Sequence, residues 1–334
     1  MGTVYVTQED AFIAKIDERL NIKFDKKSIL DVPLLKVDGV VIMGRASISP
    51  AAIAELIHNK IPLTFLTVNG KYIARLEPEM SKNIFLRNAQ WKAAGESIKA
   101  VHVAKAFVRG KLKNYRNSLL KTQRNYRDID TSKGISQIES SLITLEKSTT
   151  VNSIRGCEGS GSAAYFGCFN EFIRVDDFSF DRRNRRPPID PINSLLSLGY
   201  SLLRHDVQGA LNIVGFDPYL GYLHTERYGK PSLALDLMEE FRPLVVDSLV
   251  LGAINRKIFK PSDFVTEPVS NAVSLTKDKL YEFLKLYQER KLSTFKHPVL
   301  GIKKNYQETF EIQARLLGKY LMGETDKYPP LVMK

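Results

Sequence analysis

The residues best suited to chemistry lie between positions 217 and 243, where one histidine precedes three acids. The histidine is His224, and the acids are Asp236, Glu239 and Glu240. Residues three and four apart share a helix face, so a helix here would gather the carboxylates at a cost of roughly 0.2–0.5 kcal/mol per like-charged pair. A divalent cation would relieve that repulsion. The stretch alone is compatible with a metal site, but an acidic helix face is more often solvated than bound to a metal.

Pro243 ends this stretch. Proline has no N–H, so a helix that continued through it would leave the carbonyl of Glu239 without its partner. The sequence therefore predicts a kink directly beside the acids.

A fourth acid, Glu158, lies in a run of small residues, SIRGCEGSGSAAYF at 153–166. Small residues let helices pack closely, so this acid is predicted to be buried. A buried acid is costly unless it is paired or bound to a metal.

The charge balance predicts a polyanionic partner. The chain has 334 residues, of which 49 are basic and 37 acidic, with a net charge of +12. Nucleic acid is the commonest partner of such a protein, and a basic chain that merely stays soluble is the alternative. Basic side chains, with Tyr115 and Tyr126 among them, gather on the helix expected after residue 83: Lys105, Arg109, Lys111, Lys113, Arg116, Lys121, Arg124 and Arg127.

A second basic cluster precedes Pro187-Pro188, which favour an extended loop. It consists of Arg182, Arg183, Arg185 and Arg186. This loop is predicted to clamp phosphates, and an exposed loop without that role is the alternative.

Cysteine usage and hydropathy predict a cytoplasmic protein without a membrane span. The two cysteines, Cys157 and Cys168, do not match a zinc-ligand spacing and are expected to be small buried residues. No signal-peptide pattern opens the chain, and no apolar run reaches the ~18 residues that a membrane helix needs.

The pattern of elements predicts an α+β protein, with a small β-rich N-terminal domain over 1–80 and a larger all-α catalytic domain over 83–323. Short runs rich in Val, Ile, Phe and Tyr predict strands in the first part, with a hairpin turn at Asn69-Gly70 and one helix capped by Ser49. From residue 83 the apolar residues recur at helical spacing. Residues 324–334 are expected to form a flexible tail.

Three separated segments together resemble one known family. They are RGCEGSGSAAYF at 155–166, RRNRRPPIDPINSLLSLGYSLL at 182–203 and GYLHTERYGKPSLALDLMEEFRP at 221–243. In this order they are similar to the CRISPR-associated adaptation endonuclease and integrase, the Cas-one family. The resemblance runs from about residue 155 to 250 and agrees with a chain that is rich in strands in its N-terminal part and helical in its C-terminal part.

The resemblance implies a metal-dependent enzyme that cuts DNA and joins new spacers into the CRISPR array. By motif, the catalytic residues would be Glu158, His224 and Glu239, and the metal ligands would be these three together with Asp236, an acid beside the ion. The ion would be Mg²⁺ or Mn²⁺. Gly161 and Ser162 stand where the family has alanines, and both are small.

The implied partners are DNA, as spacer precursor and CRISPR repeat, a second copy of the chain, and a small ferredoxin-like protein, Cas-two. We expect the strand-rich part to mediate the homodimer, because its strand edges must be covered. The residues expected to bind DNA are Arg155, Arg182, Arg183, Arg185, Arg186, Arg227 and Lys230.

Two alternatives remain open from the sequence. One is a non-catalytic DNA-binding scaffold that keeps the acids for structure. The other is a nuclease that acts on branched DNA in repair.

Overall fold

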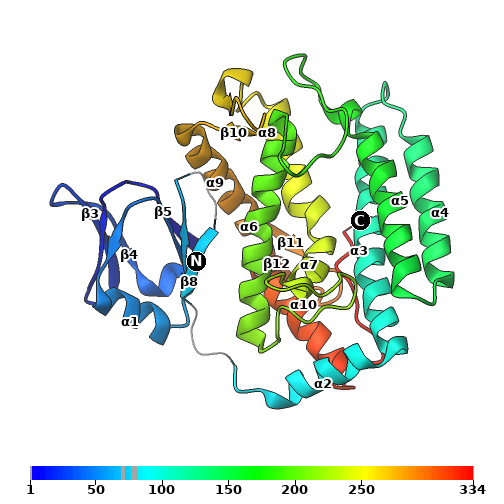
Figure 1. Cartoon of the computed structure of the whole chain (residues 1–334), viewed down its shortest axis with the longest axis horizontal. Coiled ribbons are helices and arrows are strands. Elements are labelled where there is room, and N and C mark those ends of the chain that lie inside the picture. Colours follow the sequence, from blue (N-terminus) through cyan, green and yellow to red (C-terminus); the bar gives the residue numbers. More distant parts are fainter. Residues whose placement is uncertain (1, 69–71, 77–80, 334) are drawn as a thin grey trace. The chain divides into compact units, whose positions relative to one another are not determined.

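The computed structural model describes residues 2–68, 72–76 and 81–333 (Figure 1). They form two compact units, of which the first contains Met1–Met80 and Thr276–Leu292, and the second contains Ser81–Leu275 and Ser293–Lys334. The first unit is rich in strands and the second is mostly helical, which confirms the predicted α+β class. No helix in the described part of the chain is both long enough and apolar enough to span a membrane.

The first unit contains two four-stranded sheets. One has the order β1-β5-β7-β8, with three parallel strands and an antiparallel edge, and the other has the order β4-β3-β2-β6. Alternate apolar side chains such as Val40, Ile42 and Leu63 form its core. The strands are β1 (Gly2–Val6), β2 (Phe12–Ile16), β3 (Arg19–Phe24), β4 (Lys27–Pro33), β5 (Val37–Met43), β6 (Ser47–Ile48), β7 (Leu63–Leu66) and β8 (Tyr72–Leu76).

The cap and the strand pairing that the sequence predicts in this unit are present in the structure. The Ser49 hydroxyl caps α1 (Pro50–His58) by accepting from the N–H of Ala52 at 3.2 Å. A short 3₁₀ turn, η1 (Leu34–Lys36), leads into β5. Strands β7 and β8 pair antiparallel, as a hairpin requires. The predicted turn at Asn69-Gly70 lies outside the described residues.

One helix from late in the chain belongs to the first unit. The sequence pattern predicts one helical domain over 83–323, but α9 (Lys277–Leu292) packs against β1 of the first unit. The Tyr281 hydroxyl donates to the carbonyl of Thr7 at 2.6 Å, and the Lys277 ammonium pairs with Glu9 at 2.5 Å. These are contacts between segments far apart in sequence, which local patterns do not encode.

In the second unit, α3, α4 and α5 pack side by side, while α6 packs against α7, α8 and α10 (Figure 1). The helices are α2 (Ile84–Gly95), α3 (Ser97–Asn125), α4 (Ser132–Lys147), α5 (Val151–Gly167), α6 (Pro191–Val214), α7 (Ser232–Leu237), α8 (Ser248–Asn255) and α10 (Tyr306–Leu321), with 3₁₀ turns η2 (Phe169–Phe172), η3 (Met238–Glu240) and η5 (Pro261–Asp263) and the π-helical turn η4 (Arg242–Asp247). Two short hairpins complete the unit: β9 (Phe264–Thr266) with β10 (Val273–Leu275), and β11 (Thr294–Lys296) with β12 (Lys303–Asn305).

The C-terminal segment is packed and not flexible, so that prediction is wrong. Leu331 is fully buried, and the Tyr328 ring packs edge-on against Phe107 of α3. The Tyr328 hydroxyl and the backbone N–H of Leu331 both donate to the Glu240 carboxylate. Two prolines in a short terminal segment are typical of a frayed end. Here, however, the buried apolar side chains and the hydrogen bonds to the Glu240 carboxylate hold the segment in place.

Truncating the Leu331 side chain therefore tests the packed tail. Leu331→Ala is expected to lower the free energy of unfolding by about 2–5 kcal/mol, because it opens a cavity in a closed site. Lys327→Ala, at an exposed position of the same segment, is the matched control and should leave stability unchanged. Urea unfolding measures both, and equal stability of the two variants would contradict the packed tail.

Candidate active site

Glu158 projects from α5 toward α3. The helix begins at Thr150, whose hydroxyl accepts from the N–H of Ser153. One turn beyond the acid, the Ser162 hydroxyl donates to Glu158 Oε1 at 2.9 Å. Gly161, which stands at one of the family's alanine positions, faces α3 so closely that a Cβ would collide with the side chain of Leu112. The small residues of α5 thus bring Glu158 close to α3.

Asp236 organises the loop that carries His224. Its carboxylate is completely buried and accepts from the N–H groups of Tyr222, Leu223 and His224 at 2.6–2.9 Å. Its Oδ1 also lies 2.7 Å from His224 Nδ1. Gly221 is required beside it, since a Cβ there would fall 2.8 Å from Asp236 Oδ2. Both oxygens of Asp236 are therefore occupied in fixing the loop and the imidazole.

With Nδ1 held by Asp236, the other ring nitrogen of His224 faces Glu239. Nε2 lies 3.9 Å from Glu239 Oε1. A histidine whose Nδ1–H is bound to a carboxylate presents a lone pair at Nε2, which is the arrangement found where imidazole binds a metal. Asp236 thus occupies the position of a supporting residue behind His224.

The acids of the 217–243 stretch do not share one helix face, so the expectation of three clustered carboxylates is wrong. The α-helical pattern ends at Leu237, and the chain continues through η3 into the π-helical turn η4. The missing N–H of Pro243 accounts for the interruption. Glu239 points toward His224, whereas Glu240 points to the C-terminal segment, where it binds Tyr328, Leu331 and Gln313.

Burial raises the pKa of the Glu240 carboxyl to about 7, against the lowering effect of its hydrogen bonds from Tyr328, Leu331 and Gln313. Its three partners are all structural parts of the second unit. Glu240 therefore anchors the tail and takes no part in the site.

Lys111 of α3 joins the two candidate carboxylates, Glu158 and Glu239, a role that the sequence alone did not indicate. Its ammonium pairs with Glu158 Oε1 and lies 2.6 Å from Glu239 Oε2, while the side chain is only 2% exposed. A signal was present, because Lys111 lies at helical spacing from Phe107, Val108 and Tyr115 and so falls on the apolar face of α3. A lysine on such a face needs a buried counter-charge.

Arg242 supplies a second cation. Its Nη2 lies 3.2 Å from Glu239 Oε1, and its guanidinium stacks over the Tyr200 ring at 4.8 Å.

Burial alone would raise the pKa of Glu158, but the charge of Lys111 and the hydrogen bonds from Lys111 and Ser162 lower it to about 2. Glu158 is therefore ionised throughout the physiological range.

The donor set fits a divalent cation. Carboxylate oxygens and a neutral imidazole nitrogen are the ligands that Mg²⁺ and especially Mn²⁺ accept. Glu239 Oε2 is buried and faces the Lys111 ammonium at 2.6 Å, in the place that a bound cation would take. Within the described part of the chain, however, no three His, Cys, Asp or Glu side chains are yet close enough together to form a metal centre. The ammonium of Lys111 stands between two of the three candidates.

A cavity of about 550 Å³ lies beside His224, at the start of α5. Thr150, Asn152 and Arg155 from α5 and its cap line one side, and Thr225 and Glu226 line the other. Arg155 is held there by a hydrogen bond to the carbonyl of Leu223 at 2.6 Å. The cavity places a cation and a helix N-terminus next to the imidazole, which suits a phosphate group.

The other residues expected to bind DNA differ in how far their side chains are exposed to solvent. Arg182, Arg185, Arg186 and Arg227 are exposed, and Lys230 is half-buried. Arg183 instead bonds Asn193 Oδ1 at 2.6 Å and Ser197 Oγ at 3.0 Å. Arg183 therefore braces the loop against α6 and is not free to bind a phosphate.

Part of the basic face of α3 is likewise used internally. Arg109 forms a two-pronged pair with Glu146 of α4 at 2.6 and 2.7 Å, and Arg116 pairs with Glu139 at 2.6 Å. Lys113, Lys121 and Arg124 remain exposed. The helix thus divides its charges between holding α4 and facing solvent.

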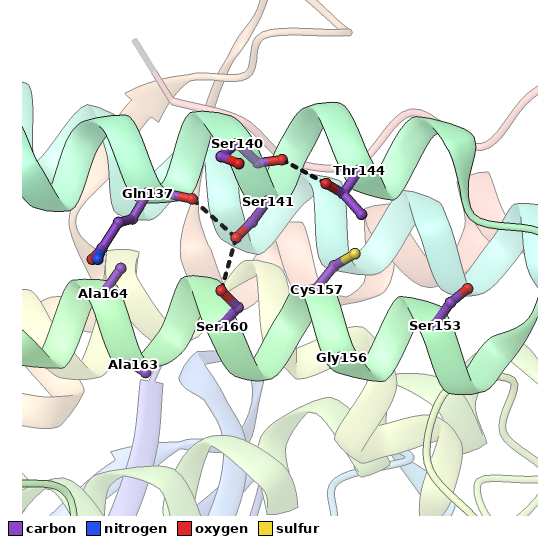
Figure 2. Close-up of a pocket in the computed structure, with 10 residues that line it drawn as sticks. All are labelled: Gln137, Ser140, Ser141, Thr144, Ser153, Gly156, Cys157, Ser160, Ala163 and Ala164. Carbon is purple, nitrogen blue, oxygen red and sulfur yellow. Dashed lines mark hydrogen bonds between the residues drawn. The ribbon is translucent and has the colours of Figure 1, made fainter.

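The opposite face of α5 packs on α4 and carries no charge. A groove of about 590 Å³ lies between them. Ser141 bonds both Ser160 and the carbonyl of Gln137 there, as Figure 2 shows. Cys157 lines this groove as a buried free thiol, as expected, while Cys168 is free but only half-buried. All ten lining residues of the described groove are uncharged, in contrast to the face that carries Glu158.

The role of Asp236 can be tested by replacing this aspartate with asparagine. Asp236→Asn keeps the shape but turns an NH₂ toward N–H donors, so it should lower the free energy of unfolding by roughly 1–3 kcal/mol. Asp181→Asn, at a side chain that is 96% exposed, is the control and should have no effect. Urea unfolding of both variants provides the measurement, and wild-type stability of Asp236→Asn would show that these hydrogen bonds do not hold the loop.

Comparison with known proteins places this geometry in one family. A family model described as CRISPR associated protein Cas1 matches residues 4–289. The CRISPR-associated endonuclease Cas1 1 of Chlorobaculum tepidum is 36% identical over 100% of this chain and 99% of its own length.

Solved structures share the fold. A casposase bound to integration product has a TM-score of 0.85 at 23% identity and covers 100% of this chain and 95% of its own. A Cas6-RT-Cas1–Cas2 complex has a TM-score of 0.79 at 23% identity and covers 98% of this chain and 36% of its own. The match over the full length of a curated relative, together with the motifs that carry Glu158, His224 and Glu239, shows that the chain belongs to the Cas1 family of CRISPR-associated proteins.

Proposed function

We propose that this chain is a metal-dependent DNA endonuclease and integrase of CRISPR adaptation, which joins new spacer DNA to the CRISPR array. The observation that carries the proposal is the convergence of Glu158, His224 and Glu239 from three separate segments of the second unit. Membership of the Cas1 family, whose curated relative is named an endonuclease, supports the same activity.

The three residues would hold one Mg²⁺ or Mn²⁺ ion. When bound, the ion would polarise the phosphoryl oxygen and take up charge on the leaving oxygen. Asp236 fixes the tautomer of His224, so that Nε2 offers a lone pair to the ion. Arg155, in the cavity beside His224, would hold a neighbouring phosphate while a 3′-hydroxyl attacks in line. In this reaction one phosphodiester bond forms as another breaks.

Its partners would be spacer-precursor DNA, the CRISPR repeat, a second copy of the chain and a Cas2 protein. One solved relative of the same fold is named as bound to an integration product, and another as part of a complex with Cas2. The net charge of +12 and the exposed arginines at 182, 185 and 186 fit a DNA partner. The chain would meet these partners in the cytoplasm.

One observation favours a second candidate, a DNA-binding scaffold without catalysis. Lys111 neutralises Glu158 and Glu239, as it would in a purely structural ion pair. Such a scaffold would need neither the imidazole nor a metal. Substitution of each proposed ligand distinguishes the two functions.

We expect Glu158→Gln, Glu239→Gln and His224→Ala each to reduce strand transfer by about 100-fold or more, because the ion would lose a ligand at the reacting phosphate. The assay joins a short duplex with 3′-hydroxyls to a plasmid carrying a CRISPR repeat, in Mn²⁺, in Mg²⁺ and in chelator. The amides keep the shape of the acids and a hydrogen-bond acceptor for Lys111.

Glu324→Gln is the control, since Glu324 is an exposed acid that does not line this cavity. It should retain wild-type strand transfer. Retained turnover in any two of the three ligand variants, or activity in chelator, would contradict the metal site and leave the scaffold.

The exposed arginines are expected to bind phosphates. Changing Arg182, Arg185 and Arg186 together to Gln should reduce the slope of log K against log salt by up to about 2.7, at about 0.9 per phosphate. Sequence preference should change little, because phosphate contacts do not read bases. A salt titration of duplex affinity in chelator measures the slope, and an unchanged slope would show that this loop does not contact DNA.

A further inference from the structure

Lys111 raises a question that the proposed metal site does not answer, because its ammonium occupies the centre of that site. We infer that Lys111 is an internal counter-ion which a divalent cation must displace from Glu158 and Glu239. This inference rests on the proposed metal-dependent function and concerns how the site changes between its metal-free and metal-bound forms.

The first support is the burial of Lys111. The side chain is 2% exposed and lies among apolar neighbours of α3. An ammonium in such surroundings is costly unless it is paired. Its ion-pair partners are the carboxylates of Glu158, from α5, and Glu239, from η3. The two acids, 81 positions apart in sequence, are therefore neutralised by the same charge.

The second support is geometric. An ammonium holds carboxylate oxygens at hydrogen-bond distance, about 2.7–2.9 Å, whereas Mg²⁺ binds them at about 2.0–2.1 Å. Lys111 thus keeps the two acids farther apart than a metal would. This accounts for the absence of a closed metal centre among the described residues, although His224 Nε2 is already 3.9 Å from Glu239 Oε1. Closing the site requires the ammonium to leave.

The third support is the charge balance. Glu158 and Glu239 face two cations, Lys111 and Arg242, so the charges of the pair are already matched. Arg242 is fixed, because its guanidinium is stacked on Tyr200. Adding a divalent cation a few ångströms from a stationary ammonium would be strongly unfavourable in a buried site. Lys111, on a flexible four-carbon stem, is the cation that can move.

The structure offers the displaced ammonium another partner. Asp247 of η4 is completely buried, and its Oδ1 accepts from the Tyr200 hydroxyl. Its Oδ2 makes no hydrogen bond of normal geometry to any described residue. Burial raises the pKa of Asp247, and Lys111 is near enough to lower it in part. A shift of the ammonium toward Asp247 would vacate the space between the two ligands without exposing a charge.

The test measures Mn²⁺ affinity of the full-length chain by calorimetry and by the Mn²⁺ electron paramagnetic resonance signal, without DNA. Lys111→Met and Lys111→Gln both remove the competing positive charge, the first with an apolar side chain and the second with a polar one. If only one of the two variants folds, that variant is sufficient for the test. Each is expected to bind Mn²⁺ at least about tenfold more tightly than the wild type. Lys111→Arg keeps the charge and should bind no more tightly than the wild type.

Lys291→Met is the matched control. Lys291 is another fully buried lysine, in the first unit, with its ammonium 3.3 Å from Thr3 Oγ1. Its substitution removes a buried charge away from the site and should leave Mn²⁺ affinity unchanged. The melting temperature adds a second measurement. Lys111→Met should melt lower than the wild type in chelator and gain more stability from Mn²⁺ than the wild type gains, whereas Lys291→Met should gain only as much as the wild type.

Equal or weaker Mn²⁺ binding by the neutral Lys111 variants would overturn the inference, and so would tighter binding by Lys111→Arg. Failure of the proposed function gives a different result. If His224→Ala bound Mn²⁺ as tightly as its parent in both the wild-type and the Lys111→Met backgrounds, the metal would not occupy this site at all.

Discussion

The second unit depends on one electrostatic constraint: Glu158 and Glu239 are held together in a largely buried space. Two such carboxylates repel each other unless a cation lies between them, and here Lys111 does so. Removing one partner from a buried ion pair costs about 3–5 kcal/mol, because the other charge is left without compensation. The packing of α3 against α5, with Gly161 close to Leu112, places the cation where both acids can reach it.

The three acids that follow His224 have three different roles because the helix that carries them is not continuous. Asp236 faces back and binds the loop, Glu239 faces the site, and Glu240 faces the C-terminal segment. On an unbroken α-helix, positions 236, 239 and 240 would share one face. The change to 3₁₀ and π-helical turns ahead of and through Pro243 separates them. Interruptions of this kind are common at functional sites.

Much of this fold follows from local sequence signals. The predicted cap at Ser49 is present, with proline at the first position of α1, and Asp190 caps α6 in the same way. The alternation of apolar residues correctly predicts a strand-rich first part and a helical second part. The motif resemblance brought Glu158, His224 and Glu239 together as candidates, and their convergence in the second unit agrees with it.

What the sequence did not reveal depends on contacts between distant segments. Lys111 resembles the other basic residues of α3 until Glu158 and Glu239 are placed around it. The C-terminal segment is fixed by Glu240, 91 positions before Leu331. Likewise, α9 joins the first unit through contacts with β1. Periodicity and propensity describe neighbours along the chain, so they do not encode such pairings.

Anomalous diffraction at the manganese edge, from crystals of the full chain grown with Mn²⁺, would show whether Glu158, His224 and Glu239 bind a single metal ion. We expect one strong peak per chain, bonded to His224 Nε2 and to a carboxylate oxygen of each glutamate, with the Lys111 ammonium moved away from between them. The absence of a peak at these residues, or a peak with Lys111 still bridging Glu158 and Glu239, would contradict this expectation.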